Sequence, residues 1–75
     1  MDTFDKLCAL ISEVLGIAPE AISLDITPKD LDADSIDMLD VVGEAEQVFQ
    51  VEITDEALEG FETIGDFVAY LDARI

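Results

Sequence analysis

Apolar residues recur at intervals of three and four positions in three separate segments, and this spacing restricts the chain to amphipathic helices. The first helix is predicted to begin at Asp2 or Thr3, either of which can cap it, and to end at Gly16. The second begins at Asp34 or Ser35 and continues for about four turns. Their predicted core residues are Phe4, Leu7, Cys8, Ile11, Val14 and Leu15, followed by Met38, Val41, Val42, Ala45, Val48 and Phe49.

The third periodic segment opens at Thr63, where Asp66 stands in the position of a capping box. Its apolar stripe is Ile64, Phe67, Val68, Leu71 and Ile75. A shorter helix is predicted before it, capped by Thr54 or Asp55 and carrying Ala57, Leu58 and Phe61. The QVEIT segment between the second and the short helix is too brief for a convincing strand, so we interpret it as a connector.

Residues 17–33 contain two prolines and no sustained periodicity, which predicts a long ordered loop. The side chains expected to hold this loop against the core are Ile17, Ile22, Leu24, Ile26 and Leu31. The predicted fold is therefore all-α, a small four-helix bundle of three main helices and one short helix, with a long first loop. A chain of 75 residues has room for one core, so we expect a single domain spanning residues 1–75.

Nineteen acidic residues face three basic ones, which gives a formal net charge of -16. Between Asp30 and Ala73 there is no Lys or Arg at all. Such a surface repels nucleic acid and anionic membranes and accelerates encounter with basic patches on other proteins. We expect a monomer with protein partners. The hydrophobic half of the composition argues against a disordered acidic tail.

Two further features bear on location and redox chemistry. The N-terminal segment has acids where a signal peptide has a basic region, and no apolar run reaches the length of a membrane span. We therefore expect a cytoplasmic protein. Cys8 is the sole cysteine and lies on the apolar face of the first helix, which predicts a buried thiol with no internal disulfide and no cysteine-based zinc site.

The stretch DLDADSIDMLD can be interpreted as a calcium loop, because Asp30, Asp32 and Asp34 alternate as the first ligands of an EF-hand do. The pattern then fails. Ser35 occupies the position that needs glycine, and Val41 occupies the position of the closing glutamate. No specific metal site is predicted, although crowded acids can still bind divalent ions loosely.

Ser35 lies at the centre of the same stretch. As a catalytic nucleophile it would need a neighbouring base, and the chain has no histidine. We therefore expect no enzymatic activity from this chain alone. Two interpretations stay open on residue chemistry: Ser35 caps the second helix, or it is an exposed serine that another protein modifies.

The sequence Asp34-Ser35-Ile36-Asp37, followed by the valine-rich acidic helix that ends at Phe49, resembles the signature of the acyl carrier protein family. The resemblance extends along the chain, through Leu15-Gly16-Ile17, Ile53-Thr54-Asp55 and Thr63-Ile64-Gly65-Asp66. A three-residue motif by itself is weak. At the start of the second helix of a small acidic four-helix domain it becomes specific.

The resemblance implies that Ser35 is the attachment site for 4′-phosphopantetheine, transferred from coenzyme A by a separate magnesium-dependent phosphopantetheinyl transferase. It further implies that Asp34 helps this transferase and its metal to engage the site. The arm would carry acyl intermediates as thioesters for fatty-acid or related lipid or polyketide biosynthesis. Acyl-loading and acyl-processing enzymes with basic patches would then dock on Ile36, Asp37, Asp40 and Glu44.

Three departures from the family pattern favour a specialised carrier. Asp32 stands where the family often has glycine, Gly43 where it has methionine, and Ala45 where it commonly has leucine. Space left by Ala45 could accept cargo, with ordinary core packing as the alternative. The hypothesis places an expandable acyl cavity among Val41, Ala45, Phe49, Ile53, Leu58, Phe61, Val68 and Leu71.

Other functions remain as alternatives on the sequence alone. Within the same chemistry, the cargo could be an aminoacyl group or another specialised intermediate. From different classes, the chain could be an acidic calcium-binding module or an acidic interaction protein that mimics a polyanion. The carrier interpretation requires Ser35, the calcium interpretation requires Asp30, Asp32 and Asp34, and the mimic requires bulk charge alone.

Overall fold

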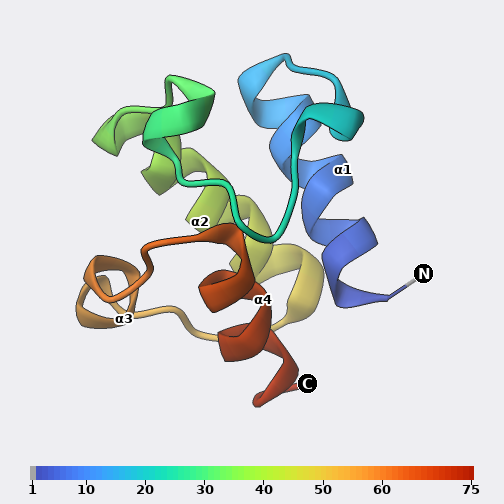
Figure 1. Cartoon of the computed structure of the whole chain (residues 1–75). Helices are drawn as coiled ribbons and strands as arrows, with labels where there is room; N and C mark the ends of the chain where they lie inside the picture. Colours follow the sequence, from blue (N-terminus) through green and yellow to red (C-terminus); the bar gives the residue numbers. More distant parts are fainter. Residues whose placement is uncertain (1) are drawn as a thin grey trace.

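The computed structural model describes residues 2–75, and four α-helices account for most of that range (Figure 1). They are α1 (Thr3–Leu15), α2 (Ser35–Phe49), α3 (Asp55–Glu59) and α4 (Ile64–Asp72), and residues 2–75 contain no strand. The predicted all-α bundle of three main helices and one short helix is confirmed. Within the same range, no helix combines the length and hydrophobicity needed to cross a bilayer.

The ends of α1 follow the predicted capping chemistry. The Asp2 carboxylate accepts a hydrogen bond from the Asp5 N–H at 2.8 Å, which satisfies one of the free donors at the helix start. At the other end Gly16 adopts a left-handed conformation with φ 69°, and its N–H donates to the Ser12 carbonyl at 2.9 Å. Glycine suits that backbone conformation because it has no Cβ to clash.

The long first loop contains two 3₁₀ turns, Pro19–Ala21 and Lys29–Leu31, that periodicity does not reveal. Its middle is fixed to the start of α4, where the Ile64 and Gly65 N–H groups donate to the carbonyls of Ile26 and Leu24 at 2.9 and 2.8 Å. A Cβ on Gly65 would lie 3.1 Å from that Leu24 carbonyl oxygen, a tight contact that would require the loop to shift by a few tenths of an ångström. The loop is thus ordered, as predicted.

The core lies where α1, α2 and α4 meet, and Figure 1 shows α1 and α3 at opposite sides of the molecule. The fully buried residues of largest volume are Phe67, Leu7, Ile11, Ile64, Leu71 and Val41. Cys8 is buried, as predicted, and burial raises the pKa of its thiol, with Asp5 and Asp2 adding to the shift. Such a thiol stays protonated and inert.

Three predicted core contacts are wrong. Val48 is 53% exposed because it lies at the margin of the α1–α2 contact rather than within it. Ile75 is 61% exposed and lies three residues beyond Asp72, where α4 ends. The Leu24 side chain is also exposed, since the loop is held there through its carbonyl rather than through its side chain.

Candidate functional site

The start of α2 presents Ser35 to solvent. Asp34 is the N-cap: its carboxylate accepts from the Asp37 N–H at 2.9 Å, and the Asp37 carboxylate accepts from the Asp34 N–H at 3.3 Å. This reciprocal capping box satisfies the helix start without the Ser35 hydroxyl. The interpretation of Ser35 as the helix cap is therefore wrong, and its side chain stays exposed in the first turn.

The loop before Asp34 is shaped by the Lys29–Leu31 turn. Asp32 closes that turn in a left-handed conformation with φ 57°, and the Ala33 N–H donates to the Pro28 carbonyl at 3.0 Å. Glycine adopts positive φ more readily than aspartate, which gives a backbone reason for the glycine that the family often carries here. After this turn, α2 begins with its first residues at the surface.

The three acids of the calcium-loop interpretation are engaged separately. The Asp30 carboxylate accepts from the Thr27 N–H at 3.1 Å, Asp32 occupies the left-handed turn position, and Asp34 caps α2. Residues 2–75 contain no group of three or more His, Cys, Asp or Glu side chains placed to hold one metal ion. This arrangement gives the calcium-loop interpretation no support.

A cleft of about 470 Å³ lies directly beside Ser35, between α2 and α3. Its apolar residues come from three elements: Pro28 of the loop, Met38 and Leu39 of α2, and Leu58 of α3 with Phe61 just after it. Asp55 and Glu59 stand at its edge. Leu39 was not predicted as a site residue; it is 55% exposed and lines this cleft, which the sequence alone does not reveal.

The residues proposed to line an acyl cavity all belong to one hydrophobic cluster. Val41, Ala45, Phe49, Ile53 and Leu71 are buried, whereas Leu58, Phe61 and Val68 are partly buried against them. Leu58 and Phe61 also line the cleft beside Ser35, so the cleft and the cluster share a wall. The Phe61 ring stacks on Phe67 with centroids 4.9 Å apart, which connects that wall to α4.

The predicted partner-binding residues differ in availability. Ile36 is 68% exposed and Asp40 is exposed, so both are free to meet another protein. Asp37 is half-buried and part of its carboxylate is used in the capping box. Glu44 is exposed, but it faces α1 rather than the Ser35 cleft.

Comparison with known proteins gives this geometry a family. A family model described as the phosphopantetheine attachment site matches residues 5–71. The acyl carrier protein of Streptococcus pyogenes serotype M1 is 42% identical over 74 residues, covering 99% of this chain and 97% of that protein. The chain belongs to the acyl carrier protein family.

Two further members of the family match most of the chain. The acyl carrier protein of Renibacterium salmoninarum is 44% identical over 66 residues, covering 87% of this chain and 82% of that protein. That of Prochlorococcus marinus is 36% identical over 74 residues, with coverage of 97% and 92%. This carrier therefore takes 4′-phosphopantetheine as its covalent cofactor, is not a catalyst, and works with the enzymes that modify it and process its cargo.

The residues at the start of α2 fit that cofactor. An exposed hydroxyl that takes no part in the helix cap is available for a phosphodiester bond. The apolar cleft beside it offers room for an uncharged chain, and the cap keeps α2 intact whether or not the hydroxyl is modified.

Proposed function

We propose that Ser35 is the attachment residue for 4′-phosphopantetheine and that the chain carries acyl intermediates in fatty-acid or related lipid or polyketide biosynthesis. This proposal rests on the different roles of the residues at the start of α2. Asp34 and Asp37 make the helix cap, which leaves the Ser35 hydroxyl exposed and chemically uncommitted. Within residues 2–75, no other element presents a serine in the first turn of a long helix.

The helix start also favours a phosphate on Ser35. The first N–H groups of an α-helix have no partners within the helix, and the helix dipole places partial positive charge at that end. Asp34 uses the Asp37 N–H, and the remaining free donors of the first turn are available to a phosphate. The nearby acids oppose this attraction, which supports a role for the transferase's magnesium ion during attachment.

We assign Asp34 two tasks in this reaction. It fixes the backbone around Ser35 through the cap, and its carboxylate lies next to the modified residue, where a transferase would present its metal ion and basic groups. The cofactor supplies a flexible arm whose terminal thiol holds the acyl group as a thioester.

The cleft between α2 and α3 is the proposed entrance for an apolar cargo. Met38, Leu39 and Phe61 offer it apolar surface next to the attachment point, and an acyl chain that leaves water gains about 0.8 kcal/mol for each buried methylene. Beyond the entrance lies the cluster that contains Ala45, which is fully buried. This apolar lining favours an acyl cargo over an aminoacyl one, whose ammonium group would lose hydration there.

Partner enzymes would dock on the outward surface of α2. Ile36 and Leu39 provide exposed apolar contacts close to Ser35, and Asp40 provides charge for an arginine or lysine of the partner. Asp37 extends the acidic surface along the helix, whereas Glu44 lies on the side of α2 that faces α1. Such contacts are strongly salt-dependent and short-lived, which suits a carrier that visits several enzymes in turn.

Intact mass spectrometry tests the attachment site. The purified chain is incubated with coenzyme A, magnesium and a broad-specificity phosphopantetheinyl transferase, beside the variants Ser35→Ala and Ser23→Ala. Ser23 is also exposed, so its variant controls for loss of a surface hydroxyl. A gain of one phosphopantetheine in the parent and in Ser23→Ala, absent from Ser35→Ala, is the expected result. A gain that survives Ser35→Ala, or no gain on folded protein, would refute the assignment.

The mass of the bound cargo tests the proposed pathway. The chain is expressed in its own cells, isolated under mildly acidic conditions that preserve thioesters, and weighed intact. Saturated or β-oxygenated acyl masses are expected for fatty-acid or polyketide work. Masses that correspond to amino acids would redirect the proposal to aminoacyl carriage.

A further inference from the structure

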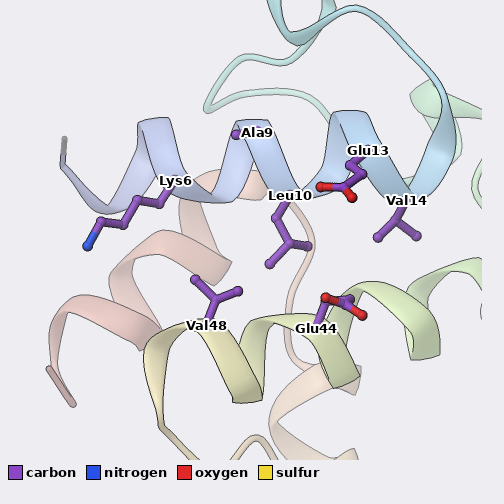
Figure 2. Close-up of a pocket in the computed structure, with 7 residues that line it drawn as sticks. All are labelled: Lys6, Ala9, Leu10, Glu13, Val14, Glu44 and Val48. Carbon is purple, nitrogen blue, oxygen red and sulfur yellow. The ribbon is translucent and has the colours of Figure 1, made fainter.

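A second apolar groove, of about 560 Å³, lies between α1 and α2 and is separate from the cleft beside Ser35 (Figure 2). Leu10 of α1 and Val48 of α2 are directed toward each other across it, and Glu13 and Glu44 lie further along it (Figure 2). Val48, on the α2 side of the groove, is 53% exposed. The fold thus leaves an apolar side chain in water at this groove.

The residues that line the groove do not neutralise its two carboxylates. Glu13 and Glu44 bring two carboxylates to it from different helices. Lys6 is the sole base among the lining residues, lies two helical turns before Glu13, and points away from both carboxylates (Figure 2). A cationic side chain placed between the two glutamates would relieve their repulsion, and an apolar one would cover Val48; Leu10 is only 7% exposed and adds little accessible apolar surface.

We propose that this groove binds a basic amphipathic helix of a partner protein. The spacing within the groove sets the pattern of that helix. Glu44 and Val48 are about one helical turn apart, so a partner helix lying along the groove would present an apolar residue and an Arg or Lys three or four positions from it. A second copy of this chain is a poor occupant, because two molecules of net charge -16 repel each other.

The groove faces away from the attachment site. Glu44 follows Ser35 by nine positions, and at about 100° per residue this separation amounts to half a turn of rotation around the α2 axis. A helix in the groove would therefore leave Ser35 and its cleft accessible. The carrier could stay tethered to one protein through the groove while other enzymes reach its arm, so the proposal extends beyond carriage itself and does not depend on it.

The test uses two synthetic peptides of about 18 residues in an Ala/Gln background, long enough to form helix in solution. The first places Leu and Arg four positions apart, so that they share a helix face. The second has the same composition but places them two positions apart, on opposite faces. Both carry the same charge, so bulk attraction to an acidic protein is equal for both.

Each peptide is titrated into the ¹⁵N-labelled chain, and amide shifts are followed by NMR. The first peptide is expected to shift residues 6–14 and 44–48 and to bind at least about fivefold more tightly than the second. Glu13→Gln should weaken its binding about threefold to fivefold. Glu62→Gln removes the same charge from an exposed residue outside the groove and should change binding less than twofold. Val48→Ser tests the apolar contact and should weaken it as well.

Equal affinity of the two peptides, equal effects of Glu13→Gln and Glu62→Gln, or shifts centred on the α2–α3 cleft would each overturn the proposal. The phosphopantetheine mass gain is then measured with and without saturating peptide. An unchanged gain supports separate faces, and a gain blocked by the peptide refutes them. A chain that shows no gain in either case contradicts the Ser35 assignment alone, because the groove is judged by the NMR titration.

Discussion

Gly43 gives a sharp test of how this helix is built, because the structure shows no internal reason for glycine there. It lies in the middle of α2, and a Cβ added to it would meet no heavy atom within 4 Å. Its φ lies outside the left-handed range, so an L-residue fits without strain. Glycine inside a helix costs about 0.8–1 kcal/mol relative to alanine. We therefore expect Gly43→Ala to raise the free energy of unfolding by about that amount.

For a domain of this size, a change of 1 kcal/mol shifts the melting temperature by roughly 4–8 °C. The assay is thermal and urea denaturation followed by circular dichroism at 222 nm. The m-value should stay unchanged, because the surface exposed on unfolding is the same. A parallel rise in the urea midpoint would place the effect in the folded helix and its propensity.

Gly65→Ala is the matched control, with the opposite expected sign. Its Cβ would lie 3.1 Å from the Leu24 carbonyl oxygen, which is held there by the 2.8 Å hydrogen bond from the Gly65 N–H. Relief of the clash would lengthen that bond, worth about 0.5–1.5 kcal/mol. A Gly43→Ala variant no more stable than the parent, or a Gly65→Ala variant as stable as Gly43→Ala, would refute the argument from local space.

Three further outcomes are expected. Raising salt or adding magnesium should increase the melting temperature, because a net charge of -16 opposes the compact state, and a flat response to both would show that repulsion is not limiting. Asp34→Asn should leave the melting temperature unchanged, because Asn caps a helix as well as Asp does, but it should slow phosphopantetheine transfer. Asp34→Ala should slow the transfer too and should also lower the free energy of unfolding by about 1 kcal/mol. Cys8 should resist thiol reagents until the chain unfolds. Its pKa is raised in the folded chain, so above the ordinary thiol pKa of 9.0 the unfolded chain loses the thiol proton first and the free energy of unfolding declines with pH. A flat pH profile in that range would contradict burial of the thiol.

The helices were predictable because their signals are local. Capping residues such as Asp34 and Thr63 act within one turn, and the three-and-four spacing of apolar residues reports a helix face directly. The attachment of Leu24 to α4 was not predictable, because it depends on a backbone hydrogen bond between segments distant in sequence. The two 3₁₀ turns are closed by local bonds, such as that from the Ile22 N–H to the Pro19 carbonyl, but three residues are too few to show a periodicity. Val48 was misassigned for a related reason: periodicity gives the side of a helix, but not how far its neighbour covers that side.

The candidate site was predictable in its centre and not in its surroundings. Ser35, Asp34 and Asp37 are adjacent in sequence, so the capping box and the exposed serine follow from a short motif. The cleft beside them is assembled from the first loop, α2 and α3, which only the folded chain brings together. Leu39 shows the difference: its helical position is evident from the sequence, but its place at a cleft depends on where α3 packs.

For the proposed cleft to admit an acyl chain, either α2 or α3 has to move. The burial of their side chains indicates which helix moves more easily. On the α2 side Val41 and Ala45 are fully buried, so moving that helix would expose the centre of the core. The α3 helix has five residues and none of them is buried. Elements with few buried contacts open at low free energy, so α3 is the wall that can yield while α1, α2 and α4 keep their packing. The cargo would then enter between Leu58 and Met38, and the stability of the carrier would rest on helices that the cargo does not displace.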